Sequence, residues 1–296
     1  YNVEIAGDDV LPQIGSKEGI LQVSLAFLNS GDGVLVPNPG YPTYTSVSNL
    51  LRANVIRYDL LEEQEWQPDF EALEKMDLTG VKLMWVNYAN MPTGGNASPG
   101  LFKKLVAFGK RHGIVICHDN PYSMILNDRP LSILSVPGAK DICIELNSLS
   151  KSHNMSGWRM GMLASNREFL QWVLKAKSNI DSGQFKPMQL AAVAALSNSD
   201  DWHHVMNSIY GERRVWGEKI MDLLGCTYDK RQVGLFVWGK LPAEVEGSES
   251  FTNELLYHAR VFITPGFIFG SNGARFVRIS LGASVDKMME AHRRIE

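Results

Sequence analysis

The chain has 296 residues, of which 45% are hydrophobic and 21% are charged, as is ordinary for a soluble globular enzyme. Its formal net charge of −3 gives no general reason to expect nucleic acid or an anionic membrane as a partner. No apolar run approaches the roughly 20 residues of a membrane-spanning helix, and the N-terminus lacks the pattern of a signal peptide.

The predicted elements alternate between strand and helix as far as about residue 185. Apolar runs predict strands at 33–39, 54–60, 81–88, 113–120, 140–150 and 160–165, and helical stretches lie between them, for example at 17–29 and 98–112. Several strands are apolar at successive positions, which is typical of a parallel sheet buried on both faces. The sequence therefore predicts an α/β fold, with a mostly parallel sheet and helices on both faces.

The pattern changes after residue 185. A long helical stretch at 188–224 is followed by predicted strands at 234–241, 260–266 and 275–281 and by an amphipathic helix at the C-terminus. This order indicates a smaller α+β unit. We therefore expect a large domain at residues 1–200 and a small C-terminal domain at residues 201–296.

The cysteines and histidines argue against disulfide or metal chemistry. Cys117, Cys143 and Cys226 are widely spaced, and the first and second lie in apolar runs, which favours reduced thiols in the core of a cytoplasmic protein. The histidines have no zinc-ligand spacing. We therefore predict no metal site.

The strongest chemical signal is the run Ser148-Leu-Ser-Lys151, followed by Gly157-Trp-Arg159-Met-Gly161. A lysine in a small-residue loop at the end of a strand can be desolvated and flanked by cations, which lowers its pKa. A neutral amine can form a Schiff base with an aldehyde and move protons. Arg159 offers a planar fork that suits a phosphate dianion. Alone, Lys151 would be assigned to the surface, but the combined motif favours a functional lysine.

This run resembles the lysine motif of the fold-type I aminotransferases of the aspartate aminotransferase family (class I/II), and the similarity extends from about residue 12 to 285. The resemblance implies pyridoxal 5′-phosphate (PLP) as the cofactor and residues 1–200 as its domain. It implies that Lys151 forms the internal aldimine and acts as the acid and base of the proton shift. It also implies that Ser148 and Arg159 hold the cofactor phosphate.

A second signal is Asp119-Asn-Pro-Tyr122 at the end of a predicted strand. A carboxylate that faces a pyridine nitrogen keeps it protonated, and the protonated ring is a better electron sink. An isolated motif of this kind would be a turn. Its position 32 residues before Lys151 matches the DxxY pattern of the family, so we assign Asp119 and Tyr122 to the cofactor, with Tyr122 donating to O3′.

Two further motifs match cofactor-binding positions of the family. Gly15-Ser16-Lys17 opens a predicted helix, whose free N–H groups and dipole favour a phosphate. The resemblance assigns Ser16 and Lys17 to the cofactor phosphate. In the run from Pro39 to Tyr44, it assigns Tyr41 to stacking on the pyridine ring. Without that context a core tyrosine is as good an interpretation.

The sequence departs from the family at Asn90-Met91-Pro92. Met91 stands where an asparagine that hydrogen-bonds O3′ is expected, and a thioether cannot donate that bond. We assign Asn90 as the substitute, although the alternation of a strand would direct it elsewhere. Arg278 matches the arginine that binds the substrate α-carboxylate in the family, with Arg275 as the alternative.

The resulting hypothesis is a PLP-dependent amino-acid aminotransferase that exchanges an amino acid with a 2-oxo acid. The alternatives are a PLP-dependent β-lyase on the same fold and a catalytically silent PLP-fold protein. The donor is left open among aspartate, aromatic amino acids and diaminopimelate. The resemblance also implies a cytoplasmic homodimer, and it implies that an N-terminal segment found in the family is missing from this chain.

Overall fold

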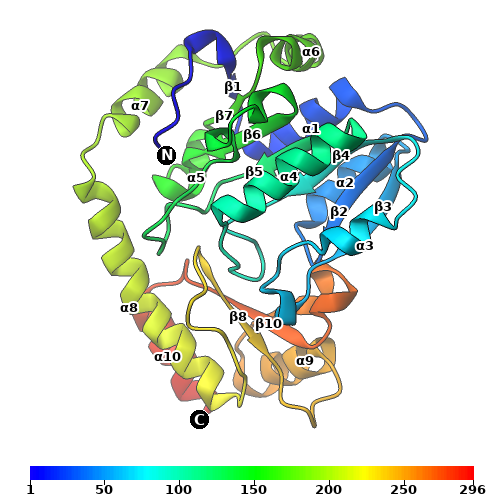
Figure 1. Ribbon diagram of the computed structural model, residues 1–296. Helices are drawn as coiled ribbons and strands as arrows, with labels where there is room; N and C mark the ends of the chain where they lie inside the picture. The colour runs from blue at the N-terminus through cyan, green and yellow to red at the C-terminus, as the bar shows by residue number, and fades with distance from the viewer.

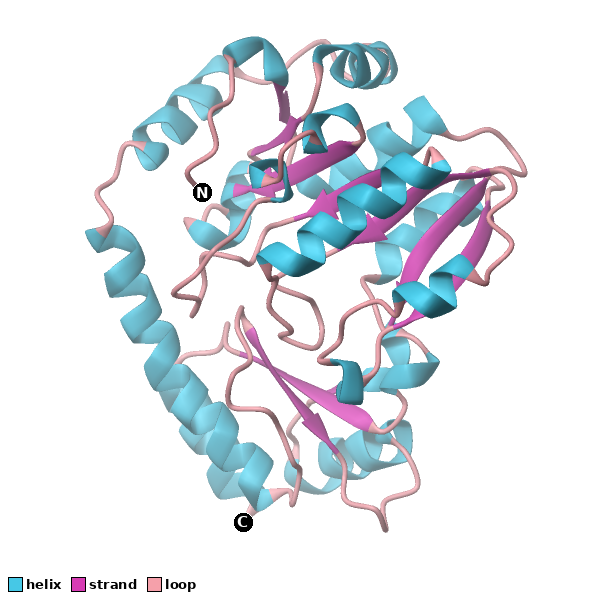
Figure 2. Cartoon of the chain, viewed as in Figure 1, coloured by secondary structure: helices cyan, strands magenta, loops and turns pink.

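Two sheets of unequal size organise the computed structural model, which describes residues 1–296 (Figures 1 and 2). The large sheet has seven strands in the order β1-β7-β6-β5-β4-β2-β3. Their bounds are β1 Val10–Gln13, β2 Gly33–Asn38, β3 Asn54–Asp59, β4 Val81–Val86, β5 Val115–Asp119, β6 Cys143–Ser148 and β7 Gly161–Ala164. Strands β2 to β6 are parallel, whereas β7 is antiparallel to β6 and β1 to β7. The predicted mostly parallel sheet is therefore confirmed, although β1 was not predicted.

Helices cover both faces of this sheet. The helices of this part of the chain are α1 Ser16–Phe27, α2 Pro42–Leu50, α3 Phe70–Glu74, α4 Pro99–His112, α5 Leu149–Ser152, α6 Arg167–Lys177 and the peripheral α7 Lys186–Leu196. Alternate residues of β4 enter different cores: Met84 packs in the cluster that contains α4 residues, and Trp85 packs in the cluster that contains α1 and α6 residues. Burial on both faces explains why the strands are continuously apolar rather than alternating.

Helix α4 shows how local sequence sets these boundaries. The Ser98 hydroxyl accepts a hydrogen bond from the Leu101 amide, and Pro99 occupies the first turn, where no amide donor is needed. Gly113 ends the helix with a φ of 66°, a conformation that costs glycine little. The predicted helix at 98–112 is confirmed to within a residue.

The second sheet lies at the opposite end of the molecule from the large sheet (Figure 1). It has three antiparallel strands in the order β8-β10-β9. The elements are α8 Asp201–Leu223, β8 Phe236–Lys240, α9 Ser248–Ala259, β9 Thr264–Pro265, β10 Phe276–Ser280 and α10 Val285–Ile295. The strand predicted at 260–266 is much shorter, because Arg260 ends α9 in a left-handed conformation. The proposed boundary at residue 200 falls between α7 and α8.

Helix α8 runs along one side of the molecule, from the level of the large sheet to the small one (Figures 1 and 2). Near its start, the Trp202 indole donates to the Ser152 carbonyl oxygen over 3.2 Å, and the Tyr210 hydroxyl donates to the Asn154 side chain over 2.8 Å. Near its end, Ile220 and Met221 are buried in the core of the small sheet. One helix thus contacts both the segment after β6 and the small-sheet core.

All three cysteines are free thiols in buried positions. Burial raises the pKa of each of these thiols, Cys117, Cys143 and Cys226, above its ordinary value. None of the helices combines the length and the apolar character that crossing a membrane requires.

Candidate active site

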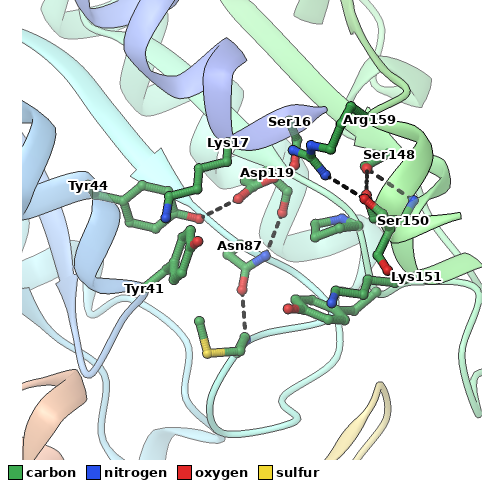
Figure 3. A pocket seen from close by; sticks show the side chains of 14 residues that line it. Ser16, Lys17, Tyr41, Tyr44, Asn87, Asp119, Ser148, Ser150, Lys151 and Arg159 are labelled. Carbon is green, nitrogen blue, oxygen red and sulfur yellow. Dashed lines mark hydrogen bonds between the residues drawn. The ribbon is translucent and has the colours of Figure 1, made fainter. Parts of the chain in front are cut away.

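The carboxyl ends of β4, β5 and β6 meet at a single cavity (Figure 3). Asn87 follows β4, Asp119 ends β5, and Ser148 ends β6, so the parallel sheet brings these three side chains to one edge. All but two of the residues predicted for the site line this cavity: Ser16, Lys17, Tyr41, Asp119, Tyr122, Ser148, Lys151 and Arg159. The exceptions are Asn90 and Arg278.

Lys151 lies in α5, the single helical turn that follows β6. Its side chain is half-buried, and burial lowers the pKa of its ammonium group, with further lowering by the charges of Arg159 and Arg278. Desolvation and neighbouring cations are the two effects that the sequence predicted. The contacts from α8 to Ser152 and Asn154 hold this segment on its outer side.

Asp119 presents an unsatisfied carboxylate oxygen at the cavity. The Tyr44 hydroxyl donates to Oδ2 over 3.0 Å, but Oδ1 is buried without a hydrogen-bond partner. Burial raises the pKa of Asp119 to about 6, and the Tyr44 bond and the charge of His118 partly oppose that rise. A buried acceptor of this kind suits a protonated ring nitrogen, which would supply the missing donor.

Small hydroxyl side chains and one arginine surround the other end of the cavity. Ser148 Oγ and Ser150 Oγ lie 3.0 Å apart, and Ser148 caps α5 by accepting from the Ser150 amide. Arg159 donates through Nη1 to the Ser156 carbonyl over 2.9 Å and through Nη2 to the Ile14 carbonyl over 3.3 Å. Together with the N-terminus of α1 at Ser16, these donors fit a phosphate dianion.

Gly15 precedes this helix N-terminus and allows Arg159 to approach it. Its φ is 75°, and a Cβ atom at this position would overlap the Arg159 guanidinium group. We predict that Gly15→Ala displaces Arg159 and weakens PLP binding by about tenfold or more, the effect of losing one charge-assisted hydrogen bond. Equilibrium dialysis measures the dissociation constant directly.

Gly31→Ala is the matched control. Gly31 also has a positive φ, of 91°, but nothing lies within 4 Å of a Cβ atom there. Both variants carry the backbone cost of about 1–2 kcal/mol in stability, and only Gly15→Ala is expected to lose cofactor affinity. Equal PLP affinity of the two variants would contradict this account of Gly15.

Asn90 does not reach the cavity, contrary to its assignment as a cofactor ligand. Its side-chain oxygen accepts from the Thr93 hydroxyl over 2.7 Å, and its amide donates to the Asn87 carbonyl over 3.0 Å. These bonds close the turn after β4 and leave Asn90 fully buried within it. Met91, the departure from the family pattern, does line the cavity.

Asn87 and Tyr44 line the cavity but were not assigned from the sequence. The Asn87 amide donates to the Asp119 carbonyl over 2.6 Å, and its oxygen accepts from the Met91 amide over 2.6 Å. Asn87 was detectable, because it lies near the end of the strand predicted at 81–88, just as Asp119 lies near the end of the one predicted at 113–120. Tyr44 lies three residues, about one helical turn, after Tyr41, which is a weak signal for a shared face.

Arg278 on β10 stands beside the cavity rather than in its wall. Its guanidinium lies over the rings of Phe236 and Phe269, 4.0 and 4.6 Å from their centroids, and Nη1 contacts Met91 Sδ at 3.1 Å. Its Nε is buried without an acceptor, and burial lowers the pKa of Arg278 to about 10. The alternative, Arg275, donates to backbone carbonyls, including that of Pro242 at 2.6 Å. Its guanidinium is therefore engaged in holding the backbone.

These features together fit PLP. Lys151 offers the amine, Asp119 offers a free buried acceptor, and the serines with Arg159 offer donors for a phosphate. Tyr41 and Tyr122 provide aromatic walls at the same cavity. This set of residues thus offers a partner for each of three groups: an aldehyde, a ring nitrogen and a phosphate.

Comparison with known proteins agrees with this interpretation. The family model "Aminotransferase class I and II" matches residues 1–295. An LL-diaminopimelate aminotransferase of Gloeobacter violaceus is 39% identical over 97% of this chain and 74% of its own length. That of Dehalococcoides mccartyi is 41% identical over 95% of this chain and 73% of its own length.

Solved structures give the same result. The apo form of BacF from Bacillus subtilis superimposes with a TM-score of 0.95 at 38% identity, covering 100% of this chain and 80% of that one. An aminotransferase from Staphylococcus aureus gives a TM-score of 0.92 at 32% identity, covering 100% and 78%. The chain belongs to the class I and II aminotransferase family. Its activity is that of a PLP-dependent amino-acid aminotransferase.

Proposed function

We propose that the residues of the cavity divide the work of transamination among them. Bound PLP supplies an aldehyde that links to amino groups and a ring that withdraws electrons from the substrate α-carbon. Ser16, Lys17, Ser148 and Arg159 hold the phosphate, and Tyr41 stacks on the ring. The free Oδ1 of Asp119 supports this proposal most directly, because a buried carboxylate oxygen otherwise has no partner.

In this proposal Lys151 Nζ removes the proton from the substrate α-carbon. It then donates that proton to the carbon on the other side of the substrate amino nitrogen. Its lowered pKa supports the role, since a base must be neutral to accept a proton. Asp119 holds the proton of the ring nitrogen, and the Tyr122 hydroxyl donates to the ring oxygen. Arg278 binds the substrate α-carboxylate. Its guanidinium is available for this role because Nε has no acceptor and Nη1 contacts only the weak acceptor Met91 Sδ.

We further propose that the amino donor is LL-diaminopimelate or an amino acid with a similarly polar, charged side chain. Support comes from the relatives at 39% and 41% identity, both of which are LL-diaminopimelate aminotransferases.

The test is a panel of amino acids added to the PLP-loaded protein while the absorbance of the cofactor is followed. Diaminopimelate, aspartate, phenylalanine and alanine form the panel, each with 2-oxoglutarate as acceptor. We expect diaminopimelate to give the largest kcat/KM. We also expect one glutamate to form for each diaminopimelate consumed. A larger value for aspartate or phenylalanine contradicts the proposed donor but keeps the aminotransferase. In a separate assay with a cysteine conjugate and 2-oxoglutarate, pyruvate released without formation of glutamate would identify a lyase.

We propose that the protein is a homodimer. Helix α7 buries only Ala192, whereas Leu190, Val193 and Leu196 on it are 58%, 61% and 64% exposed. An apolar face of this kind on a peripheral helix is typical of a subunit interface (Figure 1).

We expect twice the chain mass in sedimentation equilibrium, and we expect Val193→Glu to yield a monomer. Leu50→Glu is the control, because Leu50 is also apolar and 71% exposed but lies on α2, outside the apolar face of α7. A monomeric wild-type protein would contradict the proposal.

We also propose a cytoplasmic location, with a small-molecule amino acid and a 2-oxo acid as substrates and with neither nucleic acid nor membrane as a partner. The buried free thiols and the net charge of −3 support it.

A further inference from the structure

Two phenylalanine rings hold the guanidinium of Arg278, and neither has a part in the mechanism above. Phe236 is the first residue of β8, and Phe269 ends the short helical turn that follows β9. The centroids of the two rings lie 4.0 and 4.6 Å from the guanidinium carbon. Strand β10, which carries Arg278, lies between β8 and β9 in the small sheet. The rings therefore come from the chain segments on its two sides.

Each ring is also joined to the wall of the active-site cavity. The Phe236 ring packs edge-on against Tyr122, with 5.5 Å between the ring centroids. The Phe269 carbonyl oxygen accepts a hydrogen bond from the Gly40 amide over 2.9 Å, and Gly40 directly precedes Tyr41. Tyr41 and Tyr122 both line the cavity. The two phenylalanines thus connect the arginine with the two tyrosines of the cavity.

The N–H groups of Arg278 are left almost unoccupied by these contacts. Nε is buried without an acceptor, and Nη1 meets only Met91 Sδ, at 3.1 Å. A thioether is a weak acceptor, whereas a carboxylate matches the fork of a guanidinium through two parallel hydrogen bonds. An aromatic face attracts the guanidinium through its charge and consumes none of its N–H groups. The rings therefore fix the side chain while its donors stay available for a ligand.

We propose that Phe236 and Phe269 are positioning residues, which hold Arg278 in the geometry that receives the substrate α-carboxylate. The proposal rests on the role given above to Arg278. An arginine side chain that is ordered before the substrate arrives loses less conformational entropy on binding. The contacts to the two tyrosines also keep the carboxylate position fixed relative to the cavity. The rings therefore act on the affinity for substrate rather than on the transfer of the proton.

The first test replaces Phe269, and in a second variant Phe236, by trifluorophenylalanine. Fluorine withdraws electron density from the face of the ring and leaves its shape nearly unchanged, so the electrostatic attraction for a cation weakens while the packing stays. We expect the KM of the best donor to rise about two- to tenfold, the effect of ordering one long side chain on binding, with kcat nearly unchanged. A second readout is the calorimetric dissociation constant, on the PLP-loaded protein, of the carboxylic acid that lacks only the donor's amino group. It should rise by the same factor.

Phe108 is the matched control for the fluorinated variants. It is fully buried in the same hydrophobic cluster as Phe269, but its ring contacts Phe70 and His112 rather than an arginine. Trifluorophenylalanine at position 108 is expected to leave the KM and the dissociation constant of the acid unchanged. Equal increases at positions 108 and 269 would assign the effect to the core in general. Unchanged values in the Phe269 and Phe236 variants overturn the proposal.

Arg278→Leu separates this proposal from the role of the arginine itself. We expect the acid to bind this variant about a hundredfold more weakly, because the carboxylate loses its charged partner. If the acid binds Arg278→Leu as tightly as the wild type, the carboxylate is not bound by Arg278 and the role of the rings falls with that assignment. If Arg278→Leu loses the acid but the fluorinated variants do not, Arg278 keeps its role and only the positioning by the rings is wrong.

Discussion

Replacement of Lys151 by alanine is expected to lower the rate of transamination by about 10⁴-fold, near the upper limit for losing one acid–base group. The half-buried amine is the only one at the cavity whose pKa is lowered by burial and by two neighbouring cations. Its loss removes both the covalent attachment to the cofactor and the group that moves the α-proton. Steady-state kinetics with the best donor of the panel give the ratio of kcat values.

Lys17→Ala is the matched control for this experiment, because Lys17 is the other lysine that lines the cavity. Its side chain is exposed, and we expect it to weaken PLP binding several-fold while kcat at saturating PLP stays close to that of the wild type. Borohydride treatment followed by mass spectrometry should locate the cofactor on the peptide containing Lys151. If the Lys151→Ala protein turns over as fast as the wild type, the proposed mechanism is wrong.

The second large effect is expected for Asp119→Asn. The amide keeps the volume of the carboxylate and can still accept from Tyr44, but it carries no charge to balance a protonated ring nitrogen. We expect kcat to fall about 10²–10³-fold, the range for removing one preorganised electrostatic group. Single-turnover loss of the α-deuteron from labelled substrate isolates the proton-transfer step from product release.

Tyr44→Phe separates the charge of Asp119 from its hydrogen bonding. This variant removes the hydrogen bond that the Tyr44 hydroxyl donates to Oδ2, yet it leaves the charge in place. A decrease of about tenfold is expected, the lower end of what losing a hydrogen bond to a charged group costs, because the charge itself remains. If the two variants are equally slow, the charge of Asp119 is not what the reaction requires.

Much of the large domain was predictable because its physical signals are local. Burial on both faces makes the strands continuously apolar, and α4 carries its start and stop signals at Ser98 and Gly113. By contrast, β1 is an edge strand that pairs only with β7 and contains Pro12, so its four residues carry no strand pattern. The short β9 was overestimated because an apolar run after Arg260 cannot be distinguished from a strand by composition.

The site was predictable where a residue type alone carries chemistry. Lys151 and Asp119 meet at one cavity because they follow or end neighbouring parallel strands, and Arg159 joins them from the turn just before β7. Asn90 was misplaced because the sequence does not reveal that the turn at 90–94 consumes its side chain in its own hydrogen bonds. The position of Arg278 behind Met91 depends on how the two sheets meet, which no local pattern encodes.

Helix α8 connects the segment that carries Lys151 with the small sheet that carries Arg278. Its first turns hold the segment that carries Lys151, and its last turns are embedded in the core that supports β10 and Arg278. Because this helix is continuous over 23 residues, the same element contacts the support of the lysine and the core of the small sheet. Arg278, proposed to bind the substrate, and Lys151, proposed to deprotonate it, are therefore both supported by the same helix.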